Sequence, residues 1–79
     1  MSYSKKQFGQ GLLDQINNGY DVIRISKWAF LEYFNNTREI SELLKDVIMD
    51  VVVMEEGPEF EYTEKELRKL ALELLKSED

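Results

Sequence analysis

The chain of 79 residues contains neither cysteine nor histidine. Without cysteine it has no disulfide, no thiolate nucleophile and no zinc–thiolate site, and without histidine it lacks the usual acid–base group at neutral pH. Apolar runs are short, as in Val51–Met54, whereas a membrane span needs about 18 residues, and no secretory or lipidation signal is evident. We therefore expect a cytoplasmic protein without a membrane contact, a metal or a cofactor.

Positive charge is also scarce. Sixteen acidic residues oppose ten basic ones, which gives a formal net charge of −6. The imbalance lies in the second half, because residues 1–38 hold five basic and three acidic residues whereas residues 39–79 hold five basic and thirteen acidic ones. A negative field repels phosphate backbones. The composition argues against binding to nucleic acid and favours a partner protein with a basic patch.

Helix-start signals and apolar periodicity divide the chain into four expected helices. Ser4 and Thr63 begin capping boxes with Gln7 and Glu66, and Ser26 is expected to cap the second helix. The first helix also carries two glycines, each of which costs about 0.5–1 kcal/mol relative to alanine. The expected helices span residues 5–17, 27–36, 38–54 and 64–76.

The third expected helix has the clearest pattern. From Ile40 to Val52 apolar residues recur at positions i, i+3, i+4, i+7, i+8, i+11 and i+12, which is one continuous stripe. The β-branched residues of 47–54 leave a strand there as the alternative. The pattern favours a single all-α domain over residues 1–79, a small antiparallel four-helix bundle with the third helix at its centre. A variant adds a two-stranded ribbon that pairs Tyr20–Ile25 with Glu59–Tyr62.

The residues left for catalysis have structural interpretations. Ser4, Ser26 and Thr63 stand where helices are expected to begin, so they are interpreted as caps. A carboxylate that acts as a general acid needs desolvation to raise its pKa, but Glu32 falls on an expected polar face. We therefore expect a protein that is not an enzyme.

The acidic segment, residues 55–66, is the strongest functional candidate. It contains six glutamates and one lysine, and two aromatic residues alternate with the glutamates. Carboxylates speed the encounter with a cationic patch, and aromatic side chains supply contact energy once water is expelled. The alternative is that the charge only keeps a small domain in solution. The expected partner-binding residues are Glu55, Glu56, Glu59, Glu61 and Tyr62.

The aromatic stretch of the second expected helix is the other candidate surface. Its large side chains surround more than half of the helix, so one thin core cannot enclose all of them. Burial by neighbouring helices is the alternative for each. The residues expected at a protein interface or a homodimer contact are Trp28, Phe30 and Tyr33.

In the order of these features the chain resembles the small acidic immunity proteins that bacteria use against bacteriocins and colicin-type nucleases. It also resembles related small Firmicute and phage proteins. It has a first amphipathic helix ending at Asn18-Gly19, an aromatic helix from Trp28 to Phe34, a long apolar helix and a leucine-rich helix opened by residues 61–68. The resemblance implies a helical bundle that binds and neutralises another protein without catalysis. The alternative function is a self-associating structural or regulatory protein, so the expected oligomeric state is a monomer or a homodimer.

Overall fold

The computed structural model describes residues 3–77, and within that range all regular secondary structure is helical. Its elements are α1 (Lys5–Asn17), α2 (Val22–Asn35), the 3₁₀ turn η1 (Thr37–Glu39), α3 (Glu42–Val52), the 3₁₀ turns η2 (Val53–Glu56) and η3 (Pro58–Phe60), and α4 (Glu64–Leu75). The predicted all-α class with four helices is confirmed. No strand occurs between residues 3 and 77, so the alternative ribbon is wrong.

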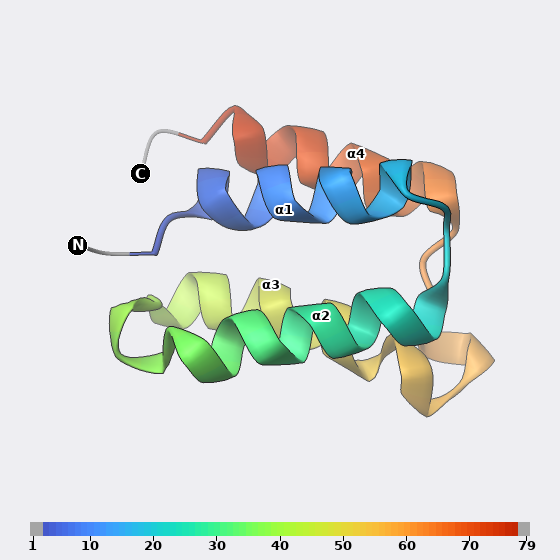
Figure 1. The fold of residues 1–79 in the computed structure, drawn as a ribbon, viewed down its shortest axis with the longest axis horizontal. Coiled ribbons are helices and arrows are strands. Elements are labelled where there is room, and N and C mark those ends of the chain that lie inside the picture. The colour runs from blue at the N-terminus through green and yellow to red at the C-terminus, as the bar shows by residue number, and fades with distance from the viewer. Residues whose placement is uncertain (1–2, 78–79) are drawn as a thin grey trace.

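The helices form two antiparallel pairs stacked in two layers (Figure 1). The first and last helices, α1 and α4, make one pair, and α2 and α3 make the other. Successive helices run in opposite directions, which gives the up-down-up-down order of a small bundle. The helix α3 is thus one member of a pair and not the centre that the apolar stripe predicted.

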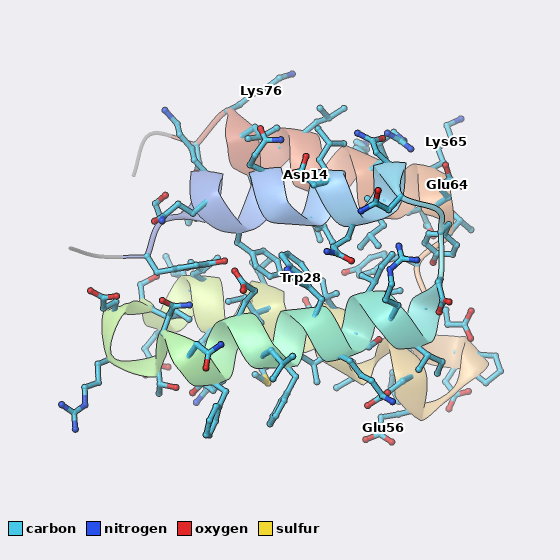
Figure 2. The ribbon with its side chains drawn as sticks, viewed as in Figure 1. Asp14, Trp28, Glu56, Glu64, Lys65 and Lys76 are labelled. Carbon is cyan, nitrogen blue, oxygen red and sulfur yellow. The ribbon has the colours of Figure 1, made fainter. Side chains whose placement is uncertain are left out.

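The hydrophobic core lies between the two layers and draws on every α-helix. Trp28 reaches from α2 into the space between the layers (Figure 2), where its ring stacks on Phe8 with centroids 5.0 Å apart. Burial of this apolar surface is the main favourable term in folding. The core residues are Tyr3, Phe8, Leu12, Ile16, Ile25, Ala29, Leu44, Ile48, Val51, Met54, Leu67, Ala71 and Leu74.

The two glycines of α1 mark close contacts that the sequence did not reveal. A Cβ atom on Gly9 would lie 2.8 Å from Cβ of Leu74 and 2.9 Å from the carbonyl oxygen of Ala71. A Cβ atom on Gly11 would lie 2.6 Å from Cζ2 of Trp28. Glycine at these positions lets α1 approach both α4 and the tryptophan ring.

The second helix begins earlier than predicted. Asp21 is its N-cap, and its carboxylate accepts a hydrogen bond from the backbone N–H of Arg24 at 3.0 Å. The segment Tyr20–Ile25, expected to be extended, is therefore helical from Val22 onward. Ser26, the predicted cap, is buried inside the helix and donates to the carbonyl oxygen of Val51. Burial of Ile25 against the core outweighs the strand preference of its β-branched neighbours.

The third helix is shorter than the predicted 38–54. Ile40 is extended, and the side chain of Ser41 caps α3 by accepting from the backbone N–H of Leu44. The helix ends at Val52 and tightens into η2. Leu43, placed on the predicted apolar stripe, is 69% exposed. The core therefore encloses Leu44, Ile48 and Val51 of the stripe, while Ile40, Val47 and Val52 are half-buried against it.

The last helix agrees closely with its prediction. Thr63 and Glu66 form the expected reciprocal capping box, and α4 ends at Leu75, one residue before the predicted end. In the part of the chain that the structure describes, no helix combines the length and the apolar character that crossing a membrane would require.

Candidate protein-binding surface

The acidic segment begins in η2, passes through η3 and ends in the first turn of α4. Met54 is fully buried and anchors η2 to the core. Pro58 then opens η3, whose backbone closes through a hydrogen bond from the N–H of Phe60 to the carbonyl oxygen of Gly57. A buried anchor followed by short turns holds the intervening glutamates at the surface.

The four glutamates predicted to bind a partner, Glu55, Glu56, Glu59 and Glu61, are all exposed. None of them forms a hydrogen bond or an ion pair through its side chain with any residue between 3 and 77. Figure 2 shows Glu56 on the side of the α2–α3 layer that faces away from α1 and α4. These carboxylates remain available to a cation from outside the described chain.

Tyr62 differs from the glutamates because it is half-buried and packs against the core. Its carbonyl oxygen accepts a hydrogen bond from the hydroxyl of Tyr20, which ties the start of α4 to the loop before α2. Burial, followed by the charges of Asp50 and Glu66, raises the pKa of Tyr62. The structure thus gives Tyr62 a role in holding the end of the acidic segment in place.

The end of the bundle where Tyr20 contacts Tyr62 has a negative electrostatic field. Burial raises the pKa of Tyr20, and the nearby carboxylates of Glu61, Glu64 and Glu66 raise it further. All three belong to the acidic segment, Glu61 just before α4 and Glu64 and Glu66 in its first turn. The field therefore extends beyond the 3₁₀ turns and would attract a cationic partner toward this end of the molecule.

A second surface runs along the outer face of α2. Four large apolar side chains on this helix, Ile23, Phe30, Leu31 and Phe34, are 50%, 49%, 53% and 67% exposed, and we call them the α2 stripe. With Lys27 they follow the spacing i, i+4, i+7, i+8 and i+11, so they share one face. The rings of Phe30 and Phe34 stack with centroids 6.2 Å apart. Lys27 separates Ile23 from the cluster of Phe30, Leu31 and Phe34. Exposed apolar clusters mark interaction sites more often than single exposed apolar residues do.

The structure separates the three aromatic residues predicted at an interface. Phe30 belongs to the α2 stripe, but Trp28 and Tyr33 are half-buried against the core. The sequence did not identify Ile23 or Phe34 as surface residues. Their shared face becomes visible only when α2 is known to begin at Val22, because an extended segment around Ile23 interrupts the helical spacing.

The α2 stripe and the acidic segment meet at a groove of about 360 Å³. Its lining is mostly apolar, and the charged members Lys27 and Glu55 form no ion pair with any described residue, each other included. The residues that line the groove are Lys27, Phe30, Leu31, Val52 and Glu55. Glu55 thus belongs to both surfaces.

Glu32 does not lie on a free polar face as predicted. Its carboxylate accepts a hydrogen bond of 2.7 Å from the hydroxyl of Tyr3. Burial, together with this hydrogen bond and the charge of Glu32, raises the pKa of Tyr3. The pair connects the segment before α1 to α2, which is a structural role. Among residues 3–77, no group of three or more acidic side chains is placed to hold a metal ion.

Comparisons with protein-family models, with curated proteins and with solved structures gave no match. The resemblance to immunity proteins therefore stays a prediction.

Proposed function

We propose that this protein is a non-catalytic protein-binding module of the inhibitor or immunity type, which binds a basic partner protein through the acidic segment. The observation that carries the proposal is the arrangement at Glu55. Four exposed glutamates without a partner in residues 3–77 stand beside an apolar groove, and Glu55 lines that groove. An acidic row next to apolar contact area has both components that recognition of a basic protein surface requires.

Each component has its own physical task. The net charge of −6 and the unpaired carboxylates raise the rate of encounter with a cationic surface. Exposed Phe60, which is 49% accessible and lies among the glutamates, can supply contact energy once the partner excludes water. Charge of this kind contributes more to association rate and to specificity than to affinity alone.

The test begins with capture of a partner from lysate and continues with titration of the purified partner at increasing salt. The test variant changes Glu55, Glu56, Glu59 and Glu61 to glutamine. We expect its affinity to fall roughly tenfold or more and the salt dependence of binding to become shallower, because fewer charges take part.

The matched control removes the same number of charges elsewhere on the exposed surface. It changes Asp14, Glu42, Asp46 and Glu73 to their amides. If binding depends on the acidic segment, this control keeps most of the affinity. Equal loss in both variants would show that only total charge matters, and no loss in the test variant would remove the acidic segment from the binding site.

A further inference from the structure

We infer that a second copy of this chain covers the α2 stripe, with the two α2 helices packed antiparallel about a two-fold axis. The inference concerns the outer face of α2, which adjoins the acidic segment at the groove and shares Glu55 with it. It does not depend on the proposed function. It rests on the positions of the stripe residues and on the charges that surround them.

The stripe is self-complementary when two copies of α2 run in opposite directions. A two-fold axis between residues 28 and 29 places Ile23 opposite Phe34 of the second copy. The same axis places Lys27 opposite Phe30, which is the pairing of a cation with the face of an aromatic ring. A two-fold contact requires a surface that matches its own rotated image, and all members of the α2 stripe fit this register except Leu31, which packs between the two pairs.

The charges of the groove also suit a second copy. Lys27 and Glu55 line one groove without pairing with each other or with another described residue. A second copy brings its own Lys27 to this groove, where Glu55 can receive it. Complementary charges of this kind fix the register of a contact.

The charge of α2 also favours contact between two acidic chains. The helix carries Arg24 and Lys27 against Glu32 alone, a balance of +1, whereas the whole chain carries −6. Glu32 is moreover occupied by Tyr3. Local charge repulsion between two copies is therefore smaller along α2 than along α3, whose residues carry a balance of −2.

Sedimentation equilibrium of the intact protein at physiological salt tests the inference, with protein from about micromolar to about millimolar concentration. We expect a reversible monomer–dimer equilibrium. Phe34→Asp should raise the dissociation constant roughly tenfold or more, because it places an unpaired charge opposite Ile23 of the second copy. Leu72→Asp is the control, since Leu72 is 44% exposed on α4 in the other layer, and it should leave the dimer unchanged. Circular dichroism verifies that each variant is folded.

A monomer over the whole concentration range overturns the inference. So does a dimer that survives Phe34→Asp or that Leu72→Asp dissociates. If Phe34→Asp does not fold, Ile23→Asp replaces it, because Ile23 is 50% exposed and lies opposite Phe34 in the proposed register.

Cross-linking tests the register itself, since the chain has no cysteine of its own. In the proposed dimer, Ile23 lies beside Phe34 of the second copy, while the two copies of Ile23 are separated by about 16 Å along the helices. A mixture of the Ile23→Cys and Phe34→Cys variants should oxidise to a linked dimer, and each variant alone should do so several-fold less. Equal linkage in all three samples would overturn the antiparallel register.

Discussion

Replacement of Gly9 by alanine gives the most direct test of how the two layers are built. At an exposed helical position this change stabilises the helix by about 0.5–1 kcal/mol, because alanine loses less backbone freedom on folding. At Gly9 the new Cβ would lie 2.9 Å from the carbonyl oxygen of Ala71 and 3.2 Å from the backbone nitrogen of Leu75. These are backbone atoms of α4 and can yield only if the helices separate.

Overpacking of this kind costs about 1–3 kcal/mol, which exceeds the gain in helix propensity. We therefore expect Gly9→Ala to lower the free energy of unfolding by about 1–2 kcal/mol, and for a chain of this size each kcal/mol lowers Tm by about 4–8 °C. Urea unfolding can be followed through the fluorescence of Trp28, the only tryptophan, whose ring stacks on Phe8. Gly57→Ala is the control, because its Cβ would meet only the flexible carboxylate of Glu59. A Gly9→Ala variant as stable as the parent would refute the close approach of α1 and α4.

Three further changes test the contacts that hold the bundle together, each by urea or thermal unfolding. Tyr3→Phe removes the hydrogen bond to Glu32 and should cost about 1–2 kcal/mol. The pKa of Tyr3 is higher in the folded protein than in the unfolded chain. The contribution of Tyr3 to the free energy of unfolding should therefore be fully present below pH about 10 and be lost as the pH rises above it. Tyr3→Phe should make the loss of stability at high pH shallower. Asp21→Ala should cost about 1 kcal/mol through loss of the α2 cap, whereas Asp21→Asn should retain most of the stability. Thr63→Ala should likewise cost about 1 kcal/mol by breaking the capping box of α4. An Asp21→Ala variant without loss would point to a helix that begins elsewhere.

The sequence predicted the start of a helix correctly where the residues that cap it lie within one turn of each other. The start of α4 was predictable because Thr63 and Glu66 complete a reciprocal capping box in four residues. The start of α2 was not, because Asp21 caps the helix alone, with Arg24 at the position that a capping box gives to glutamate or glutamine. The β-branched residues that follow favour a strand in isolation. Burial of Ile25 between the layers favours the helix over the strand, and the residues that bury it are distant in sequence.

The two candidate surfaces were also predictable to different degrees, because one depends on local composition and the other on contacts between helices. Exposure of the acidic glutamates follows from their charge, which is costly to bury without a partner. Exposure of Phe30 and burial of Trp28 depend on which side of α2 meets α1, and Gly11 is the residue that leaves room for the tryptophan ring. From the sequence alone, that glycine only lowers the stability of its helix. In the structure, the missing side chain of Gly11 leaves the space that the ring of Trp28 on α2 occupies.

The uneven distribution of charge gives the two proposed contacts opposite responses to salt. Two chains of charge −6 at about 20 Å, the shorter dimension of the molecule, repel by about 7 kcal/mol without screening and by less than about 1 kcal/mol at physiological ionic strength. The pairs of Lys27 with Glu55 are exposed and are each worth about 0.2–1 kcal/mol, so the repulsion dominates at low salt. Self-association through α2 should therefore strengthen as salt is added, while binding of a basic partner to the acidic segment should weaken. Self-association that weakens with salt would mean that attraction between opposite charges, and not apolar contact along the α2 stripe, holds the two copies together.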